Sequence, residues 1–348
     1  MKIEAVDLFC GIGGLSYGLK QSGIQIQAGV DLDPKSQFPF EVNNRAQFIH
    51  RSVTEVSGEE ITQLYSSNTI RLLAGCAPCQ PFSRYSQGPK GRNDDQWMLL
   101  GEFARLIRES GPELVTMENV PNLASHEVFK DFVSDLKNVG YHVSYRVVNC
   151  DEHGLPQTRK RLVLIASLLG YIEFKLPKNR TVTVREVLSD FAPLSAGDID
   201  PIDPFHRSSR LSELNLKRIK ASKPGGTWRD WPEYLRAECH KKRSGRTYTA
   251  VYARMSWDKP APTITTQFHG FGNGRFGHPE QNRAITLREG AALQGFPKSY
   301  KFVEPGKPIE FDAVGRLVGN AVPPPLGRWI GETFRDHVSQ LTSATLSF

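Results

Sequence analysis

Hydrophobic positions in the first half of the chain follow two periods in turn, and this predicts an α/β sheet. Short apolar runs of strand length are each followed by apolar residues at helical spacing, the pattern of repeated β–α units with parallel strands. The predicted strands are 2–9, 24–30, 70–74, 114–117, 143–148 and 162–166. The predicted helices are 15–21, 97–108 and 127–138, and a glycine just past the last one suits a helix end.

The pattern changes near residue 177. From there to about residue 283 the chain is rich in Pro, Gly, Ser, Lys and Arg and has weak periodicity, which predicts a second, smaller and irregular domain. We therefore expect a large α/β domain at 1–176, the irregular domain at 177–283, a hinge segment at 284–317 and a C-terminal segment at 318–348 that returns to the first domain. Helical patterns at 287–293 and 326–338 lie in the last two segments.

Two clusters of basic residues lie in the irregular domain. Their members are Lys217, Arg218, Lys220 and Lys223, and then His240, Lys241, Lys242, Arg243 and Arg246. Such clusters are more often a solvated surface than a binding site. The 348 residues carry a formal charge of +7, which permits a polyanionic partner without requiring one.

The cysteine count and the apolar runs indicate the compartment. Five cysteines are too few, and odd in number, for a disulfide framework, so a reducing cytoplasm is expected. No stretch has the roughly 18 consecutive apolar residues of a membrane span, and the first residues do not form a secretory signal.

A glycine-rich turn at 7–14, DLFCGIGG, joins the first predicted strand to the first helix. Glycines there let the backbone turn tightly and approach a ligand, and Asp31 at the end of the next strand suits a ribose diol. Because the pyrophosphate fingerprint G-x-G-x-x-G is incomplete, a nucleoside cofactor without a pyrophosphate fits better, and S-adenosylmethionine is one. A turn that binds no ligand remains the alternative.

A cysteine loop at 75–83, GCAPCQPFS, follows another predicted strand. Cys76 and Cys79 could form half of a zinc site, but no second pair at ligand spacing appears, so no metal is expected. A redox dithiol lacks a thioredoxin-like context. The third alternative is a single nucleophile, Cys79, held between prolines.

Glu118 ends one predicted strand, and two arginines precede another. The sequence ENV at 118–120 places a carboxyl where α/β sheets bind ligands, although Glu118 could also be a helix-start residue. In QTRKR at 157–161, Arg159 and Arg161 alternate, so both are expected on one strand face with their guanidinium groups in one pocket. A basic strand edge that resists aggregation is the alternative.

Together these segments closely resemble one family, the DNA (cytosine-5)-methyltransferases of the bacterial restriction-modification type. The resemblance covers nearly the whole chain in order and rests on the motifs quoted above, on REGAALQGFP at 288–297 and on VGNAVPPPLG at 318–327. It implies a Rossmann-like methyltransferase domain with a mostly parallel sheet, S-adenosylmethionine as cofactor, and a target recognition domain at 177–283.

The resemblance also implies a role for individual residues. Cys79 resembles the nucleophile that adds to C6 of a flipped-out cytosine, Glu118 the group that binds and protonates N3, and Arg161 the group that holds O2, with Arg159 supporting Glu118 or a phosphate. The cofactor residues it implies are Phe9, Gly11, Gly13, Gly14, Asp31, Leu32, Ser52, Pro78 and Asn320. The DNA-binding residues expected from the loop after Cys79 and from a short element near the end of the recognition domain are Ser83, Arg84, Lys90, Arg92 and Thr263.

Three positions depart from the family pattern. Ser52 stands where the family often has an Asp that holds adenine, Leu32 replaces a frequent aromatic residue, and Gly290 lies inside a predicted helix at some cost in stability. The resemblance further implies double-stranded DNA as partner, a cognate restriction endonuclease, and a nucleoid-associated enzyme in the bacterial cytoplasm. We expect a monomer, because one flipped base needs only one active site.

Three other functions compete with this interpretation. A tRNA cytosine-5 methyltransferase has a similar cysteine loop, but the large basic domain and the missing Cys-Phe-Thr signature of that group favour DNA. A DNA-binding regulator that lost catalysis is disfavoured by the complete set Cys79, Glu118, Arg159 and Arg161. A nicotinamide oxidoreductase is disfavoured by the incomplete dinucleotide fingerprint.

Overall fold

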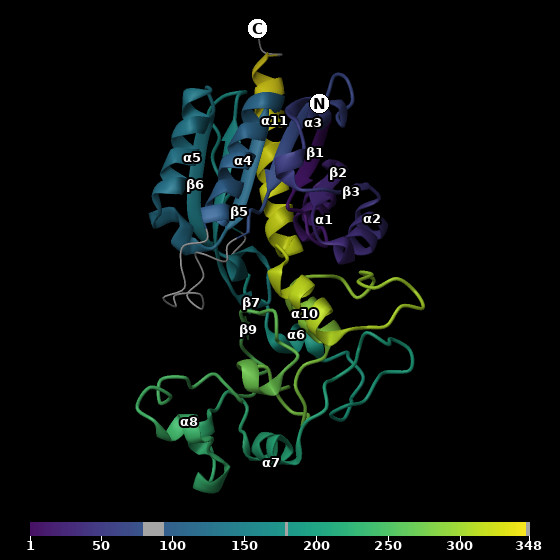
Figure 1. Cartoon of the computed structure of the whole chain (residues 1–348), viewed down its shortest axis with the longest axis vertical. Coiled ribbons are helices and arrows are strands. Elements are labelled where there is room, and N and C mark those ends of the chain that lie inside the picture. Colours follow the sequence, from purple (N-terminus) through teal and green to yellow (C-terminus); the bar gives the residue numbers. More distant parts are fainter. Residues whose placement is uncertain (79–93, 178–179, 346–348) are drawn as a thin grey trace. The chain divides into compact units, whose positions relative to one another are not determined.

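The computed structural model describes residues 1–78, 94–177 and 180–345, and the chain divides into two compact units (Figure 1). Unit 1 comprises Met1–His153, Lys160–Lys178 and Ala321–Phe348. Unit 2 comprises Gly154–Arg159 and Asn179–Asn320. Nearly all of the predicted irregular stretch and the whole segment 284–317 therefore belong to unit 2.

Unit 1 is built on a seven-stranded sheet with the order β3-β2-β1-β4-β5-β8-β6. All neighbouring pairs from β3 to β5 are parallel, and only β8 runs antiparallel to its neighbours β5 and β6, which confirms the predicted mostly parallel sheet. The strands are β1 (Ile3–Leu8), β2 (Gln25–Asp31), β3 (Gln47–His50), β4 (Ile70–Gly75), β5 (Leu114–Asn119), β6 (His142–Asn149) and β8 (Lys160–Ser167).

Helices cover the sheet because its central strands are apolar on both faces. Every residue of β1 and of β5 is buried, as expected for strands packed between two helical layers. Helix α4 packs against α3 and α5, and α1 packs against α2 and α11 (Figure 1). The helices are α1 (Gly14–Gln21), α2 (Gln37–Asn44), α3 (Gly58–Gln63), α4 (Asp94–Ser110), α5 (Glu127–Asn138) and α11 (Pro324–Thr345).

The contact between α1 and α11 depends on glycines that let two helix backbones touch. A Cβ atom on Gly18 would lie 2.2 Å from the carbonyl oxygen of Pro324, and one on Gly327 would lie 2.7 Å from that of Leu15. Because such distances exclude any side chain, the two helices pack backbone to backbone. The last helix of the chain is thereby fixed to the first.

Unit 2 has short elements joined by long irregular segments. Its helices are α6 (Val184–Leu188), α7 (Glu213–Ala221), α8 (Glu238–Lys241), α9 (Leu287–Leu293) and α10 (Phe311–Asn320), and its strands β7 (Gln157–Thr158) and β9 (Ala261–Pro262) pair in parallel. Trp228, Trp231 and Phe271 belong to one small apolar cluster. The buried guanidinium of Arg254 donates to the carbonyl oxygens of Ile219, Ser222, His278 and Gln281. The side chain of Arg254 thus supplies hydrogen-bond donors to backbone carbonyls. In a regular sheet, such carbonyls would accept from a neighbouring strand.

Gly290 in α9 is explained by close packing. A Cβ atom there would lie 2.0 Å from Cε2 of the fully buried Phe268 ring. We expect Gly290→Ala to lower the free energy of unfolding by about 1–3 kcal/mol, because overpacking outweighs the better helix propensity of alanine. Chemical denaturation would measure this loss. Exposed Gly101 in α4, where a Cβ atom meets nothing within 4 Å, is the matched control, and Gly101→Ala should be neutral or stabilising. Equal stability of the two variants would contradict the packing argument.

Among the described residues, no helix has the length and apolar character that crossing a bilayer requires.

Candidate functional site

The candidate site of unit 1 lies where its parallel strands end. Strands β1, β2, β4 and β5 run in the same direction, so their carboxyl ends share one edge of the sheet. Asp31 is the last residue of β2, Glu118 is the second-last of β5, and Cys76 directly follows β4. Residues far apart in the sequence are therefore neighbours along this edge.

Glu118 is the buried acid at this edge. Its side chain is 4% exposed, and its Oε1 lies 2.7 Å from Nε of Arg161, whose side chain is 15% exposed. The pair forms because Val163 lies opposite Glu118 in the antiparallel β5–β8 pairing, and Arg161 is two residues away on the same face of β8. A buried carboxylate held by a guanidinium can hold or transfer a proton at a fixed position.

Two further residues of this group were not predicted from the sequence. The Cys76 thiol donates to Oε2 of Glu118 at a distance of 2.9 Å. The Asn119 side chain, 2% exposed, donates through Nδ2 to the carbonyl oxygen of Ala77 at 3.0 Å, while its Oδ1 accepts from the backbone N–H of Val120. Asn119 thereby fixes the backbone that leads into Pro78. The only signal for it in the sequence is its place directly after Glu118.

The glycine-rich turn is held by Asp31. One carboxylate oxygen accepts from the backbone N–H of Gly11 and the other from that of Asp33, each at 2.8 Å. Burial raises the pKa of Asp31, and these two N–H donors oppose the rise. Phe9 has φ 57° and Gly13 has φ 82°, and a left-handed Phe is a strained conformation of the kind that marks binding sites.

The space beside this turn suits a nucleoside. A Cβ atom on Gly11 would meet no atom within 4 Å, so the backbone faces open space there. Leu32, directly after Asp31, is 63% exposed and offers an apolar surface to a flat ring. Ser52 caps the short helix 53–55, accepting from the N–H of Thr54 at 3.2 Å, so its hydroxyl already has a local partner. The donors and acceptors present therefore fit a ribose better than an adenine amino group.

Asp7 was also missed, although it begins the glycine-rich motif. It is 1% exposed, and its Oδ2 accepts from the hydroxyl of Ser16 in α1 at 2.6 Å. Burial raises its pKa to about 7, with the Ser16 hydrogen bond opposing. This hydrogen bond ties the end of β1 to α1 across the turn. The signal in the sequence was an acid near the end of a predicted buried strand.

Of the other predicted residues that the structure describes, Gly14 begins α1 in unit 1, and Arg159, Thr263 and Asn320 lie in unit 2. The sequence predicted Arg159 on the same strand as Arg161, and this prediction is wrong. It lies between β7 and β8, and its guanidinium donates to the carbonyl oxygens of Ile264 at 3.1 Å and Gly319 at 3.3 Å. The Thr263 hydroxyl donates to the carbonyl oxygen of Thr158 at 2.7 Å. Asn320 is exposed and is the last residue of α10.

Five predicted residues lie outside the described part of the chain, namely Cys79, Ser83, Arg84, Lys90 and Arg92. Their roles rest on the sequence alone.

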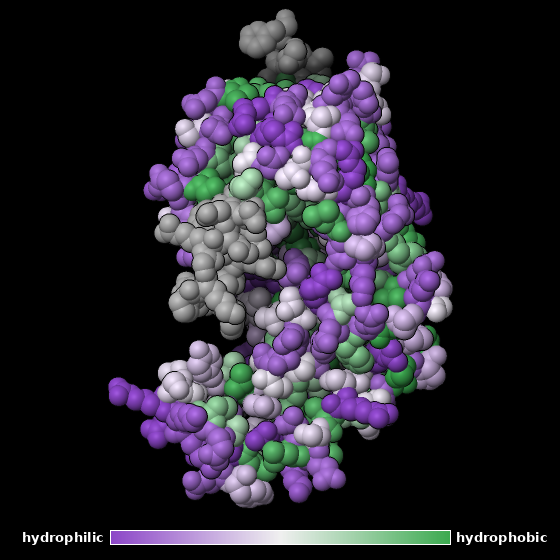
Figure 2. All heavy atoms as spheres, viewed as in Figure 1, coloured by the Kyte–Doolittle hydropathy of each residue, from purple (hydrophilic) through white to green (hydrophobic). Residues whose placement is uncertain are grey.

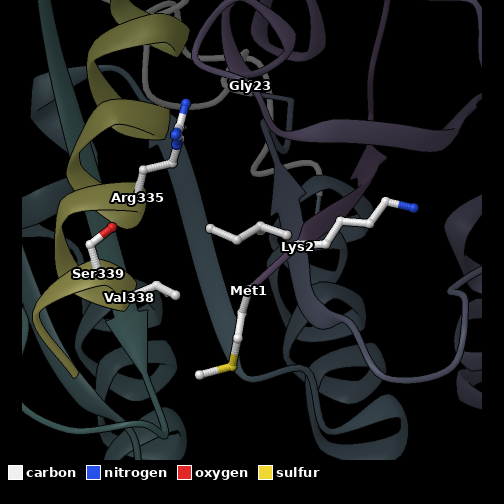
Figure 3. A pocket seen from close by; sticks show the side chains of 7 residues that line it. Met1, Lys2, Gly23, Arg335, Val338 and Ser339 are labelled. Carbon is white, nitrogen blue, oxygen red and sulfur yellow. The ribbon is translucent and has the colours of Figure 1, made fainter. Parts of the chain in front are cut away.

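A cavity of about 370 Å³ lies elsewhere in unit 1 (Figure 3). Its lining includes Met1, Lys2 and Ile3 at the start of β1 and Arg335 of α11. It therefore lies at the amino end of the sheet, opposite the edge that carries Glu118 and Asp31. Within residues 1–78, 94–177 and 180–345, no group of three or more His, Cys, Asp or Glu side chains could hold a metal ion.

Comparisons with known proteins agree with this fold. The family model of C-5 cytosine-specific DNA methylases matches residues 3–335. Type II methylase M.HgiDII of Herpetosiphon aurantiacus is 51% identical over 337 residues, which are 95% of this chain and 94% of that protein. Type II methyltransferase M1.HphI of Haemophilus parahaemolyticus is 31% identical over 95% of this chain and 86% of its own length. For the fold alone, a protein encoded within an Escherichia coli prophage has a TM-score of 0.75 at 20% identity, covering 97% of this chain and 100% of that one.

The parallel sheet, the acid at its carboxyl edge and the family match define a methyltransferase, and the chain belongs to the C-5 cytosine-specific DNA methylases. It is a DNA (cytosine-5-)-methyltransferase of the bacterial type II restriction-modification class. This confirms the resemblance drawn from the motifs and is incompatible with the oxidoreductase alternative.

Proposed function

We propose that this enzyme methylates C5 of a cytosine that it flips out of a specific double-stranded DNA sequence, through a transient bond between Cys79 and C6. The observation that carries the proposal is the buried Glu118–Arg161 pair at the carboxyl edge of the sheet. A flipped base is required because C5 and C6 cannot be reached in stacked DNA. The modification would protect DNA from a cognate restriction endonuclease.

The chemistry assigns one task to each residue. The thiolate of Cys79 adds to C6 while Glu118 protonates N3, so the electron pair that would build up on the ring is placed at C5. Arg161 holds Glu118 and faces O2 of the base. After C5 has gained its methyl group, C5 loses its proton to water and the bond to Cys79 breaks. N3 returns its proton to Glu118, and the ring becomes aromatic again. Arg159, whose guanidinium donates to the carbonyl oxygens of Ile264 and Gly319, would instead hold the backbone of unit 2 in place.

S-adenosylmethionine is the proposed cofactor, and it supplies an electrophilic methyl group when bound. Asp31 would bind the ribose hydroxyls, and Leu32 and Phe9 would contact the adenine. Gly11, Gly13 and Gly14 would let the backbone approach the cofactor. Ser52, Pro78 and Asn320 complete the proposed set.

We expect Asp31→Ala to weaken S-adenosylmethionine binding by about 10- to 100-fold. The variant loses a charged hydrogen-bond partner for the ribose, at a cost of about 1.5–3 kcal/mol. It also leaves the N–H of Gly11 without its acceptor. Isothermal calorimetry with the cofactor would measure the change. Asp33→Ala, which removes the half-buried cap of the helix 34–36, is the matched control and should bind normally. Undiminished affinity of Asp31→Ala would exclude Asp31 from the cofactor site.

Unit 2 is the proposed target recognition domain, and its second basic cluster is the better candidate for contact with DNA. In the first cluster, Arg218 is buried and donates to the carbonyl oxygen of Leu235 and to Asn215. The second cluster begins on α8 and continues into a loop at 242–249, in a region where hydrophilic side chains project from the surface (Figure 2).

Two side-chain hydrogen bonds give this loop a fixed shape. Trp228 donates through Nε1 to the carbonyl oxygen of Tyr248, and Arg229 donates to that of Arg246. Lys242, Arg243 and Arg246 are exposed. Because this loop is already ordered and its cations point outward, it can contact phosphates without a further loss of conformational entropy.

Replacing Lys242, Arg243 and Arg246 together by glutamine should lower the affinity for duplex DNA by at least about tenfold at low salt. Each lost phosphate contact should also reduce the slope of log K against log salt by about 0.9. Fluorescence anisotropy over a salt series would measure both quantities. The matched control replaces three exposed lysines of the first cluster, Lys217, Lys220 and Lys223. An equal loss in both variants would show an effect of bulk charge and not of this loop.

A mechanism-based trap tests the proposed function as a whole. Duplexes in which 5-fluorocytosine replaces cytosine, incubated with enzyme and S-adenosylmethionine, should yield a denaturation-resistant complex, because fluorine cannot leave C5 as a proton does. Mass spectrometry should locate the bond at Cys79. Methyl transfer to normal duplexes without any trapped complex would overturn the covalent route, and transfer to tRNA in preference to duplex DNA would overturn the substrate.

The proposal also covers the cellular location and the oligomeric state of the enzyme. The two relatives named above are bacterial type II proteins, so we place this enzyme in the bacterial cytoplasm at the nucleoid. A monomer is sufficient for one flipped base.

A further inference from the structure

The contact between Cys76 and Glu118 is an uncommon one for a catalytic acid. The thiol lies 2.9 Å from Oε2 of Glu118, a short distance for a sulfur donor, and Glu118 is 3% exposed. The opposite carboxylate oxygen, Oε1, faces Arg161. One carboxyl group therefore has a thiol on one side and a guanidinium on the other.

The strand register explains why these two side chains meet. In the parallel pairing of β4 with β5, Gly75 lies opposite Met117. The next residue on each chain is Cys76 and Glu118, so the two lie side by side where the strands end. A thiol at this place reaches the carboxyl without any loop movement.

A thiol acts on a carboxylate in a way that few other side chains of its size can. It is a weak donor with no charge, so it can fix the direction of one oxygen without competing with the guanidinium for the negative charge. Alanine or glycine at position 76 would leave Oε2 without this donor. The carboxyl could then rotate away from the orientation that proton transfer to a base requires.

We propose that Cys76 is a positioning residue, whose thiol holds the carboxyl of Glu118 in the orientation needed to protonate N3 of the flipped cytosine. The inference rests on the proposed role of Glu118. It assigns to the first cysteine of the Cys76-x-x-Cys79 motif a task different from that of the second, in place of a shared metal or disulfide.

The first experiment compares Cys76→Ala with Cys76→Ser in single-turnover methylation at saturating DNA and cofactor. We expect the alanine variant to be slower by about tenfold, the loss of one hydrogen bond to a charged group made by a weak donor. Serine, which keeps a donor, should restore the rate to within about threefold of wild type, since such polar replacements keep the bond. DNA affinity should be unchanged in both, because Cys76 acts through Glu118.

Buried Cys150 provides the matched control in the same unit. Cys150→Ala removes a thiol of equal size from the interior, so it reports any loss of rate that comes from stability alone. Thermal unfolding of all three variants separates the two effects. A loss of rate in Cys76→Ala that serine does not restore, or an equal loss in Cys150→Ala, would overturn the proposal.

A double-mutant cycle with Glu118→Gln gives the decisive measurement. If Cys76 acts through Glu118, Cys76→Ala should have little further effect once Glu118 is gone, whereas independent roles would give multiplicative losses. The outcomes are distinguishable from those of the proposed function. If Glu118→Gln itself leaves the rate unchanged, the role of Glu118 fails; if Glu118→Gln is slow but Cys76→Ala is normal, only the role of Cys76 fails.

Discussion

Glu118→Gln should slow methyl transfer by about 10²- to 10⁴-fold, the usual contribution of a positioned general acid. The amide has nearly the same shape as the carboxyl, but it cannot deliver a proton to N3, and it no longer balances the charge of Arg161. The fold should survive, because glutamine still fills the space at the end of β5. Single-turnover incorporation of labelled methyl groups into duplex DNA would measure the rate, and circular dichroism would check the fold.

A second Arg–Glu ion pair, at the start of β5, provides the control for that substitution. Glu113, directly before β5, pairs with Arg71 at 2.8 Å, and both side chains are about one quarter exposed. Glu113→Gln breaks an Arg–Glu pair at the opposite edge of the sheet and should leave the methylation rate unchanged. A rate constant for Glu118→Gln equal to that of Glu113→Gln would remove Glu118 from the mechanism.

Cys79→Ser should abolish turnover, with a loss of at least about 10³-fold, and should leave DNA binding within a few-fold of wild type. A thiol is partly ionised near neutral pH and is strongly nucleophilic, whereas a serine hydroxyl is neither without a neighbouring base. The variant should also give no trapped complex with 5-fluorocytosine duplexes. Gel analysis of the denatured reaction would show this, and anisotropy would show that binding persists.

Two other cysteines, which have no proposed catalytic role, provide comparisons for Cys79. Cys239 is exposed, so Cys239→Ser tests whether an accessible thiol alone matters, and it should keep full trapping. Cys10 lies in the glycine-rich turn, where burial raises the pKa of its thiol and keeps it in the unreactive form. Normal methylation by Cys79→Ser would refute the covalent route.

The sequence predicted the elements of unit 1 whose stability comes from a periodic buried face. Helix α5 has the predicted bounds, and β1, β2, β4, β5 and β8 agree to within two residues at each end. These segments bury an apolar stripe or a continuous apolar run, and that pattern is local. Helix α3 was missed because it is short and depends on the capping box of Ser57 and Glu60.

Contacts between segments that are distant in the sequence limit how much of the site the sequence alone can predict. The place of Glu118 at a carboxyl strand end followed from the predicted strand 114–117. The neighbours Cys76 and Asn119 depend on the register between β4 and β5, which spacing along one strand does not give. Arg159 was misplaced for a related reason. It leaves β8 because β7 pairs with β9, a partner about a hundred residues away, and only tertiary structure reveals that pairing.

The backbone contact between α1 and α11 has a consequence for biosynthesis. Residues of unit 1 flank unit 2 on both sides in the sequence, so the ribosome completes unit 2 before α11 has been made. Until then the face of α1 that carries Gly18 lacks the helix that packs against it. A nascent chain should therefore be unable to methylate DNA before α11 has been made, and a messenger cut short before α11 should produce no partially active enzyme.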